Sequence, residues 1–362
     1  MKDVFTILNT MNNCQEKKAL ATIIEVNGSS YRKPGALMLY LKSGTQIGLL
    51  SGGCLEDDLA LRAECVMQEK SSCSIVYDLQ AKDDVGWGQG KGCNGKITVL
   101  VEAVDNLLQQ HLLKAGHFLQ QGSSVLHVKK LSKTDRVVEY LFLSQQGDHF
   151  GTWTSNIPAS FYSFLQTKTK HTLLLEILGE RYFLQLFRPQ PRLIVFGAGP
   201  DVRPLADYAS SIGFHVIVTD WRPALCHPRF FPKAAKIIVD FPSAFLHDFQ
   251  FSPHDFVLLM THHFQKDQEI LRSLLHQQVR YLGVLGPRNR TYQLLEEQKI
   301  PEWFHSPLGL SIGAEGPEEI AISILAELIK EYRRKEPYDC WNLSCGRTKQ
   351  ENGMCETLSS LG

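Results

Sequence analysis

The sequence predicts an α/β protein in which an α+β domain precedes a doubly wound, parallel-sheet domain. Two observations lead to this prediction. Between Arg192 and Asp220, an apolar run, a turn at Gly197 and Gly199, and a helical pattern are followed by a second apolar run that ends in an acidic residue. Further along the chain, strand-like runs alternate with helical patterns, which is typical of parallel sheets. The second half is therefore expected to be Rossmann-like.

A bound dinucleotide is a separate question from the fold. Asp220 lies 23 residues after Gly197, where a carboxylate meets the ribose hydroxyls in such domains. Two positions depart from the usual fingerprint. Val202 replaces the third glycine, and Pro200 lacks the N–H group that a pyrophosphate would use. The sequence therefore predicts the fold and leaves NAD binding open.

The domain boundaries follow from composition and periodicity. We expect a first domain over residues 1–187, a linker at residues 188–191 (RPQP), the parallel-sheet domain over 192–336 and a polar tail over 337–362. In the first domain, strand-like runs at residues 124–130, 137–143, 171–178 and 181–187 are expected to complete the sheet that begins with residues 19–26. Residues 152–170 are polar and aperiodic, so no element is predicted there.

Composition excludes several classes of protein. Lys plus Arg and Asp plus Glu both number 38, so no basic field favours nucleic acid. No apolar run approaches the roughly 18 residues of a membrane span, and the first residues lack the apolar core of a signal peptide. We therefore expect a cytoplasmic protein without membrane or nucleic-acid partners. Nine cysteines without a C-x-x-C pair argue against a zinc ribbon, so any functional cysteine is expected to act singly.

Cys54 is the strongest single candidate for chemistry in the first domain. It follows Gly52 and Gly53 and precedes a helical pattern, and the positive end of a helix favours a thiolate. A soft thiolate suits sulfur transfer or a soft metal. The alternative is an ordinary small core residue. Cys93 lies in a second loop, residues 83–95, whose five glycines indicate either irregular turns or close backbone approach to a ligand.

In the second domain, ligands are expected at the carboxyl ends of the strands. Three loops fall there: the Gly197 turn, Thr261-His-His263 and Gly286-Pro-Arg-Asn-Arg290. The two arginines of the last loop, Arg288 and Arg290, suit a phosphate or carboxylate, or they cover a helix surface. His262 and His263 are adjacent, so on a strand end they would point in opposite directions and at most one would be functional.

Several motifs in a fixed order resemble one known family, and the resemblance runs from about Val4 to Arg334. The motifs are GSSYRKPG, SGGCLEDD and GKGCNGKITVLVE, then FGAGPDVRPL, TDWRP, MTHHFQKD, YLGVLGPRNR and IGAEGPEEIAISILAEL. On these motifs the chain resembles the XdhC/CoxI family of molybdoenzyme accessory proteins. The resemblance implies an XdhC/CoxI-type N-terminal domain followed by a Rossmann-like domain.

The same resemblance implies a function. A member of this family would bind molybdenum cofactor, promote exchange of an oxo for a sulfido ligand by a cysteine desulfurase, and deliver the cofactor to xanthine dehydrogenase, working as a homodimer. The cofactor-binding residues implied by the motifs are Arg32, Gly52, Gly53, Cys54, Glu56, Cys93, Gly197, Gly199, Asp220, His262, Arg288 and Glu319. Cys54 would be the contact to molybdenum.

Two other functions remain open at this point. The two-glycine turn with Asp220 favours an NAD-dependent oxidoreductase, although beyond the candidate histidines the sequence offers no clear hydride-transfer apparatus. A purely structural adaptor whose nucleotide fold binds nothing is the third hypothesis. Binding of cofactor or of NADH separates the three.

Overall fold

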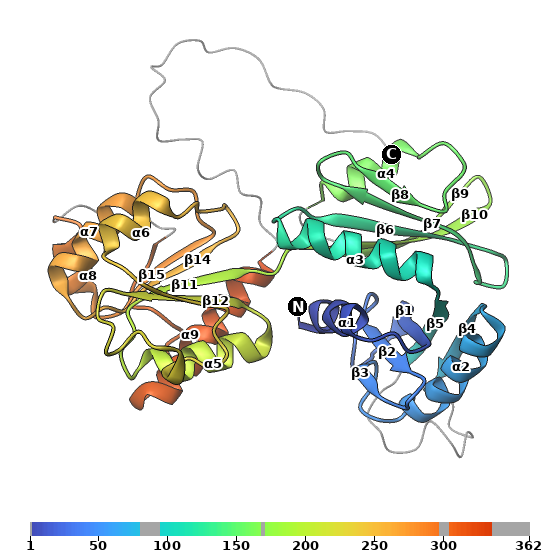
Figure 1. Ribbon diagram of the computed structural model, residues 1–362, viewed down its shortest axis with the longest axis horizontal. Helices are drawn as coiled ribbons and strands as arrows, with labels where there is room; N and C mark the ends of the chain where they lie inside the picture. The colour runs from blue at the N-terminus through green and yellow to red at the C-terminus, as the bar shows by residue number, and fades with distance from the viewer. Residues whose placement is uncertain (1, 80–94, 168–170, 297–303, 335–362) are drawn as a thin grey trace, which may run out of the picture.

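The computed structural model describes residues 2–79, 95–167, 171–296 and 304–334, which build three sheets (Figure 1). The first sheet is antiparallel, with the strand order β3-β2-β1-β5-β4. The helix α2 (Glu56–Glu69) covers one of its faces, and α1 (Lys2–Asn13) packs on the other. Its strands are β1 (Lys18–Gly28), β2 (Leu37–Leu41), β3 (Gln46–Gly48), β4 (Ser72–Asp78) and β5 (Gly95–Val104).

Side-chain alternation along β1 explains the two-faced burial of the first sheet. Ala19, Ala21 and Ile23 enter the core below α2, whereas Leu20 enters the core below α1. Both faces are therefore apolar, and most of β1 is buried on both sides.

Residues 106–187 form a second antiparallel sheet with the order β8-β7-β6-β10-β9. The expectation that these strands extend the first sheet is wrong. β5 is already paired with β1 on one side and with β4 on the other, so β6 has no free edge to join there. The elements are α3 (Asn106–Gln120), β6 (Val125–Leu131), β7 (Val137–Ser144), β8 (His149–Gly151), α4 (Ala159–Leu165), β9 (Thr172–Ile177) and β10 (Glu180–Phe187).

The helix α4 lies in the stretch where no element was predicted. It is one short helix of 7 residues, and it buries Phe161, Phe164 and Leu165 against the second sheet. Two turns give too few apolar positions to establish a helical period in the sequence.

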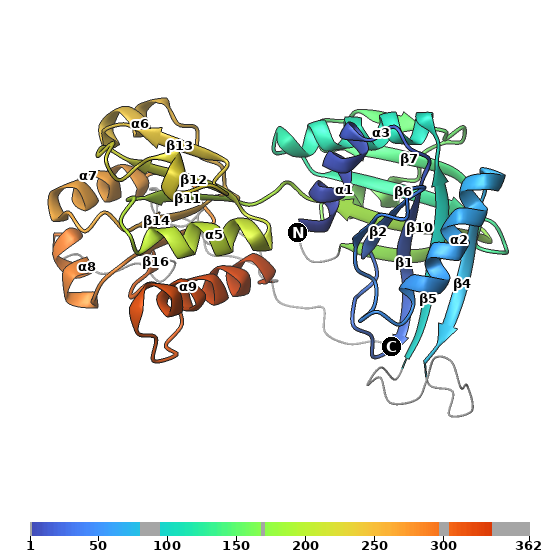
Figure 2. The ribbon, with the colours of Figure 1, turned by 60° about the horizontal axis from the view of Figure 1, so that its bottom comes forward.

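The two antiparallel sheets share one core. α3 runs along the second sheet with α1 beside it (Figure 2), and apolar residues of both helices pack with residues of both sheets. A fully buried ion pair between Lys129 of β6 and Glu102 of β5 also links the sheets. A buried charge requires its partner, so this pair fixes how the sheets meet.

The remaining residues form the predicted parallel sheet, with the order β13-β12-β11-β14-β15-β16. This is the dinucleotide-fold order, so the predicted Rossmann-like domain is confirmed. α5 and α9 cover one face, and α6, α7 and α8 cover the other. The strands are β11 (Arg192–Phe196), β12 (His215–Asp220), β13 (Lys236–Val239), β14 (Phe256–Leu259), β15 (Tyr281–Val284) and β16 (Phe304–His305). The helices are α5 (Val202–Ile212), α6 (Pro242–Asp248), α7 (Phe264–Leu274), α8 (Arg288–Leu294) and α9 (Gly316–Arg333).

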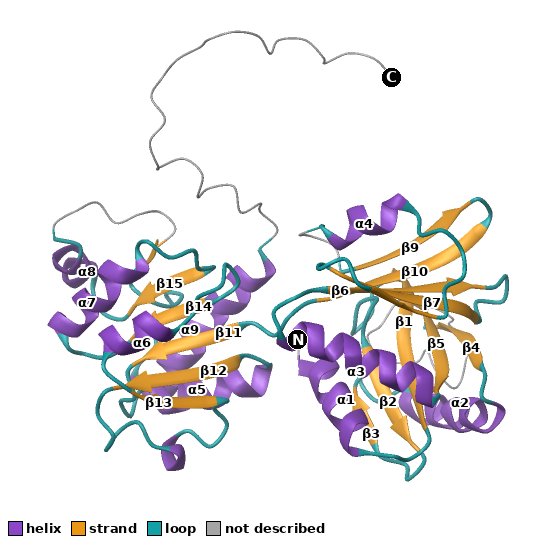
Figure 3. Cartoon of the chain, turned by 45° about the horizontal axis from the view of Figure 1, so that its top comes forward, coloured by secondary structure: helices purple, strands orange, loops and turns teal. Residues whose placement is uncertain are grey.

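The position of the linker sets the direction of this sheet. β11 begins at Arg192, directly after the linker residues, and its neighbours run parallel to it. All carboxyl ends therefore point away from the two antiparallel sheets, as the arrowheads in Figure 3 show. Within the described ranges, no helix combines the length and the apolar character needed to cross a membrane.

Candidate functional site

The glycine turn after β11 is explained by close packing. A side chain at Gly197 would place its Cβ 2.3 Å from the backbone oxygen of Met260, and the residue has a φ of +119°. At Gly199, a Cβ would come within 2.5 Å of the Asp201 carboxylate. Val202, at the third glycine position, is fully buried in the core under α5. The turn therefore needs Gly197 to bring β11 against the loop after β14, whereas at Gly199 the Asp201 side chain could move aside.

Asp220 closes the same turn from the end of β12. Its buried carboxylate accepts a hydrogen bond from the backbone N–H of Ala198 at 2.8 Å. It also accepts two from the guanidinium of Arg222, at 2.9 and 2.7 Å. The charge that a ribose would meet is thus already paired within the protein. Sequence reasoning missed Arg222, although its spacing of two residues from Asp220 in the TDWRP motif was the available signal.

His262 and His263 lie beyond the end of β14, not on the strand. His262 has a φ of +58°, an uncommon backbone conformation for histidine, and its Nε2 lies 2.8 Å from Asp201. His263 caps α7, because its Nδ1 accepts from the backbone N–H of Lys266 at 3.4 Å. His262 therefore faces the glycine turn, whereas His263 caps the helix and has a structural role.

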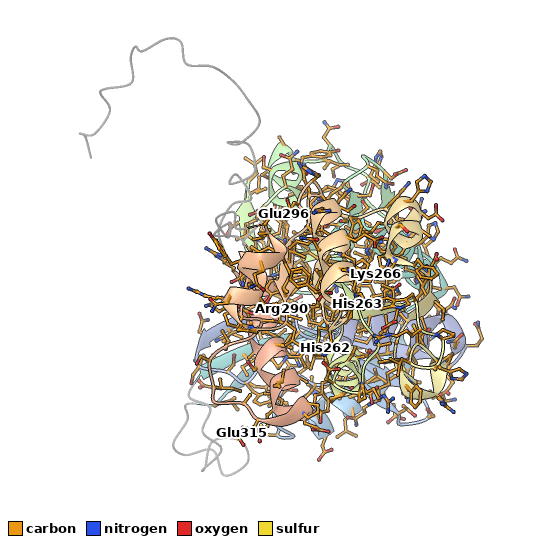
Figure 4. All side chains as sticks on the ribbon, turned by 90° about the vertical axis from the view of Figure 1, so that its left-hand side faces the viewer. His262, His263, Lys266, Arg290, Glu296 and Glu315 are labelled. Carbon is orange, nitrogen blue, oxygen red and sulfur yellow. The ribbon has the colours of Figure 1, made fainter. Side chains whose placement is uncertain are left out.

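Figure 4 looks onto this edge of the sheet, where His262, His263 and Arg290 come toward the viewer. Arg290 donates to the buried carboxylate of Asp267 at 2.6 Å, so it is a structural ion pair. Arg288 is exposed and donates to the backbone oxygen of Ser306 at 3.3 Å. Glu319 is also exposed and accepts from the backbone N–H of Glu315. Arg288, Glu319 and both histidines are exposed, whereas Arg290 is half-buried.

The loop before α2 is held by Ser51. Its hydroxyl oxygen accepts hydrogen bonds from the backbone N–H groups of Gly53, Cys54 and Leu55, at 3.0 to 3.2 Å. The thiol of Cys54 is half-buried. A Cβ added at Gly52 or at Gly53 would meet no atom within 4 Å, so the space in front of both glycines is open. Cys54 is therefore a fixed thiol beside an open backbone surface.

Glu56 stabilises this loop from the protein interior. Its buried carboxylate accepts from the Ser51 hydroxyl, from the Ser51 N–H at 2.8 Å and from the Leu55 N–H at 3.1 Å. Burial by itself would raise the pKa of this carboxyl, but the hydrogen bonds from Ser51 and from the backbone N–H groups of Glu56 and Leu55 together hold the pKa below its usual range. Glu56 thus stays ionised and shapes the turn that presents Cys54.

Arg32, in the loop between β1 and β2, pairs with Asp3 of α1. Both line a cleft of about 800 Å³ that lies between the antiparallel sheets and the parallel-sheet domain. The described residues that line this cleft do not include Cys54. The structure therefore separates the implied residues into three places: the cleft, the Cys54 loop and the carboxyl edge of the parallel sheet.

Cys93 lies outside the described residues. Among the residues that the structure describes, no group of three His, Cys, Asp or Glu side chains is arranged to hold a metal ion.

Family models match three consecutive parts of the chain. Residues 14–78 match the XdhC and CoxI family, and residues 106–188 match a domain described as BH1974-like, central domain. Residues 193–328 match the XdhC Rossmann domain. The second match corresponds to the second antiparallel sheet, together with α3.

Three relatives match the chain over most of its length. A protein from Bacillus subtilis (strain 168), named as a probable subunit of xanthine dehydrogenase, is 45% identical over 92% of this chain and 99% of its own. The molybdenum cofactor insertion chaperone PaoD of Escherichia coli (strain K12) is 24% identical over 89% of this chain and 85% of its own. A crystal structure described as a xanthine dehydrogenase from Bacillus halodurans superposes with a TM-score of 0.84 at 50% identity, covering 94% of this chain and 98% of that one. The chain therefore belongs to the XdhC and CoxI family.

Proposed function

We propose that this protein binds molybdenum cofactor as cargo, supports its sulfuration and delivers it to xanthine dehydrogenase or a related molybdenum hydroxylase. One observation carries the proposal most directly. The chain matches nearly the whole length of both a molybdenum cofactor insertion chaperone and a probable xanthine dehydrogenase subunit. Matches of this extent include all three sheets, so they do not rest on the nucleotide fold alone.

The chemistry of the chain fits this cargo. The cofactor combines a soft, sulfur-accepting metal with a pterin and a terminal phosphate, so its carrier needs a soft donor and anion donors. Cys54 offers a half-buried thiol on a loop fixed by Ser51 and Glu56. The open space at Gly52 and Gly53 lets a ligand approach the backbone closely. Arg32 and Arg288 are the anion donors that the motifs imply.

The proposed partners follow from the steps of this function. A cysteine desulfurase would supply the sulfur atom that replaces the oxo ligand, and a molybdoenzyme would receive the cofactor. Both contacts would be transient and in the cytoplasm, and the carrier would be a homodimer. The protein would thus act as a maturation factor, and the catalytic turnover would belong to its partners.

The geometry gives less support to an NAD-dependent oxidoreductase. That function needs Asp220 at the ribose hydroxyls, but this carboxylate is engaged by Ala198 and Arg222. It also needs the glycine turn to be shaped for a pyrophosphate. Packing against Met260 already accounts for Gly197.

Pterin content tests the proposed function. The protein is purified from a host that makes molybdenum cofactor, and its pterin is oxidised to the fluorescent derivative and measured per chain. We expect a value near one for the wild type and a clear loss in Cys54→Ala, with Cys65→Ala as the control because Cys65 is an exposed thiol on α2 away from the loop. Absence of pterin from the wild type, despite confirmed cofactor supply, would contradict the proposal.

A further inference from the structure

The cleft between the antiparallel sheets and the parallel-sheet domain has the size of a small-molecule site. Its volume of about 800 Å³ lies within the range of ligand pockets. It is built by segments far apart in the sequence: the loop between β1 and β2, the end of β10, the linker and the end of α9. Figure 2 shows α9 ending close to the linker, on the side of the domain that faces α1. The cleft therefore exists only in the assembled chain.

Positive charge dominates the lining of this cleft. Among the described residues that line it, Arg32, Lys33, Arg188 and Arg333 are cationic, and Asp3 is the one carboxylate. In the described part of the chain, Lys33 and Arg333 form no salt bridge, whereas Arg32 shares its charge with Asp3. Lys33 and Arg333 thus give the cleft a surplus of positive charge, which suits an anion, and Arg188, whose guanidinium also donates to the backbone oxygen of Thr167, adds a cation from the linker.

The cations of the cleft affect the pKa values of two neighbouring side chains, His171 and Tyr332. His171 keeps an exposed edge, but desolvation by the surrounding protein, followed by the charges of Arg188 and Arg333, lowers its pKa to about 4. Burial raises the pKa of Tyr332, while Arg188, Arg280 and Arg333 oppose that rise. Arg188 of the linker and Arg333 of α9 therefore act on the same space.

The cleft also has features for the organic part of a ligand. Gln185 of β10 is only 4% exposed, and its amide nitrogen donates to the backbone oxygen of Gly35 at 2.8 Å. Its amide oxygen is buried without a hydrogen-bond partner, and a buried acceptor of this kind is costly unless a ligand or water donates to it. Tyr31, next to Arg32, is 61% exposed and offers an aromatic face in the same cleft.

We propose that this cleft binds the phosphorylated pterin of the molybdenum cofactor, with the phosphate at Arg188 and Arg333. The pterin has N–H groups that match the free oxygen of Gln185 and a flat ring that matches Tyr31. The inference rests on the proposed function, and it places the phosphate end of the cargo in a cleft that Cys54 does not line. It also gives Arg32 and Lys33 of the GSSYRKPG motif a shared role.

Pterin content of matched variants tests the cleft. The full-length protein is purified from a cofactor-producing host as wild type, Arg333→Glu, Tyr31→Ala and Lys330→Glu. Arg333 and Tyr31 are exposed, so their replacement is expected to leave the fold intact. Lys330 is an exposed cation on the same helix that does not line the cleft, so it controls for net charge. We expect pterin per chain to fall about tenfold in Arg333→Glu and in Tyr31→Ala, and to stay at the wild-type level in Lys330→Glu.

The outcomes separate this inference from the proposed function. Wild-type protein without pterin contradicts the proposed function itself. Pterin that is retained by both cleft variants but lost in Cys54→Ala overturns the cleft and leaves the function standing. An equal loss in Lys330→Glu shows a general charge effect and also overturns the cleft. A nucleotide that co-purifies in place of pterin, identified by its absorbance and chromatography, overturns the assignment of the ligand.

Discussion

The hydroxyl group of Ser51 donates to the buried carboxylate of Glu56, and the same oxygen accepts from three consecutive backbone N–H groups. One side chain thereby satisfies three backbone donors of the turn that precedes α2. The Leu55 N–H is shared between Ser51 and the Glu56 carboxylate, so the two residues fix the SGGC turn from both sides. The position of Cys54 is a direct result of this pair.

Replacing Ser51 by alanine is expected to loosen the Cys54 loop. The change removes a hydrogen bond to a buried carboxylate and the acceptor of three N–H groups, which costs about 2 kcal/mol of unfolding free energy. Urea denaturation gives the stability, and the rate of Cys54 alkylation by a small reagent, which we expect to rise, reports the loop. Ser43→Ala is the control, because Ser43 is exposed and its hydroxyl contacts Thr45 and Glu16, not the Cys54 loop. An unchanged alkylation rate in Ser51→Ala would contradict this role.

Replacing Asp220 by asparagine is expected to destabilise the parallel-sheet domain. The variant leaves Arg222 without its partner and weakens the acceptor for the Ala198 N–H, at a cost of about 2 kcal/mol, since Arg222 itself is partly solvated. Asp248→Asn removes an exposed partner of His247 and should leave the melting temperature unchanged. The two variants are compared by thermal unfolding. Equal melting temperatures would show that Asp220 is not a structural residue.

The buried ring of His127 predicts loss of stability in mild acid. Burial, and then the charge of Lys129, lower the pKa of His127 well below 6.5, so the folded chain keeps this ring neutral while the unfolded chain protonates it. The contribution of the neutral His127 ring to the free energy of unfolding is therefore fully present above about pH 6.5. Below that pH the free energy of unfolding falls, by up to about 1.4 kcal/mol per pH unit.

Urea denaturation at pH 7.5 and pH 5.5 measures this effect. In His127→Phe the ring still stacks on Phe142, which lies 4.0 Å away between centroids, so the loss between the two pH values should be smaller than in the wild type. His247→Gln serves as the control, because His247 is exposed and should not alter the difference. A pH dependence that is identical in His127→Phe and the wild type would contradict the explanation.

Glu327 is predicted to anchor α9 to the parallel sheet. Its carboxylate accepts from the Tyr281 hydroxyl at 2.6 Å and from the Gly309 N–H at 2.8 Å, and it lies 3.0 Å from the His305 ring. Glu327→Ala removes all three partners and should cost about 3 kcal/mol of unfolding free energy. Glu318→Ala, in the exposed first turn of the same helix, should cost a few tenths of a kcal/mol at most. Chemical denaturation of the two variants compares them, and equal midpoints would refute the anchor.

Local patterns in the sequence were sufficient for the parallel-sheet domain. Its strands are short apolar runs, each followed by a turn and a helical period, and chain order with right-handed crossovers then limits the topology. The same patterns located the strands of residues 124–187 but not their pairing. Antiparallel strands of similar composition have no local signal that assigns them to one sheet or to two.

The candidate site was predictable only in part, for a related reason. The glycine turn, His262 and the SGGC loop lie in compact motifs, so their spacing was visible. The structure shows in addition which side chains are already engaged: Asp220 by Arg222, and Arg290 by Asp267. The GSSYRKPG motif indicated one wall of the cleft, but the rest had no sequence signal, because Arg188 and Arg333 line it only through packing of the two halves.

The linker leads directly into β11 and so directs every carboxyl end of the parallel sheet away from the cleft. Substitutions at these two ends have no shared side-chain partners among the described contacts, and effects at such distant positions add. We therefore expect the effects of a substitution at His262 and a substitution at Arg333 on the free energy of unfolding to be additive. Residues at the carboxyl edge of the sheet can thus be replaced without compensating substitutions in the cleft, and the reverse also holds.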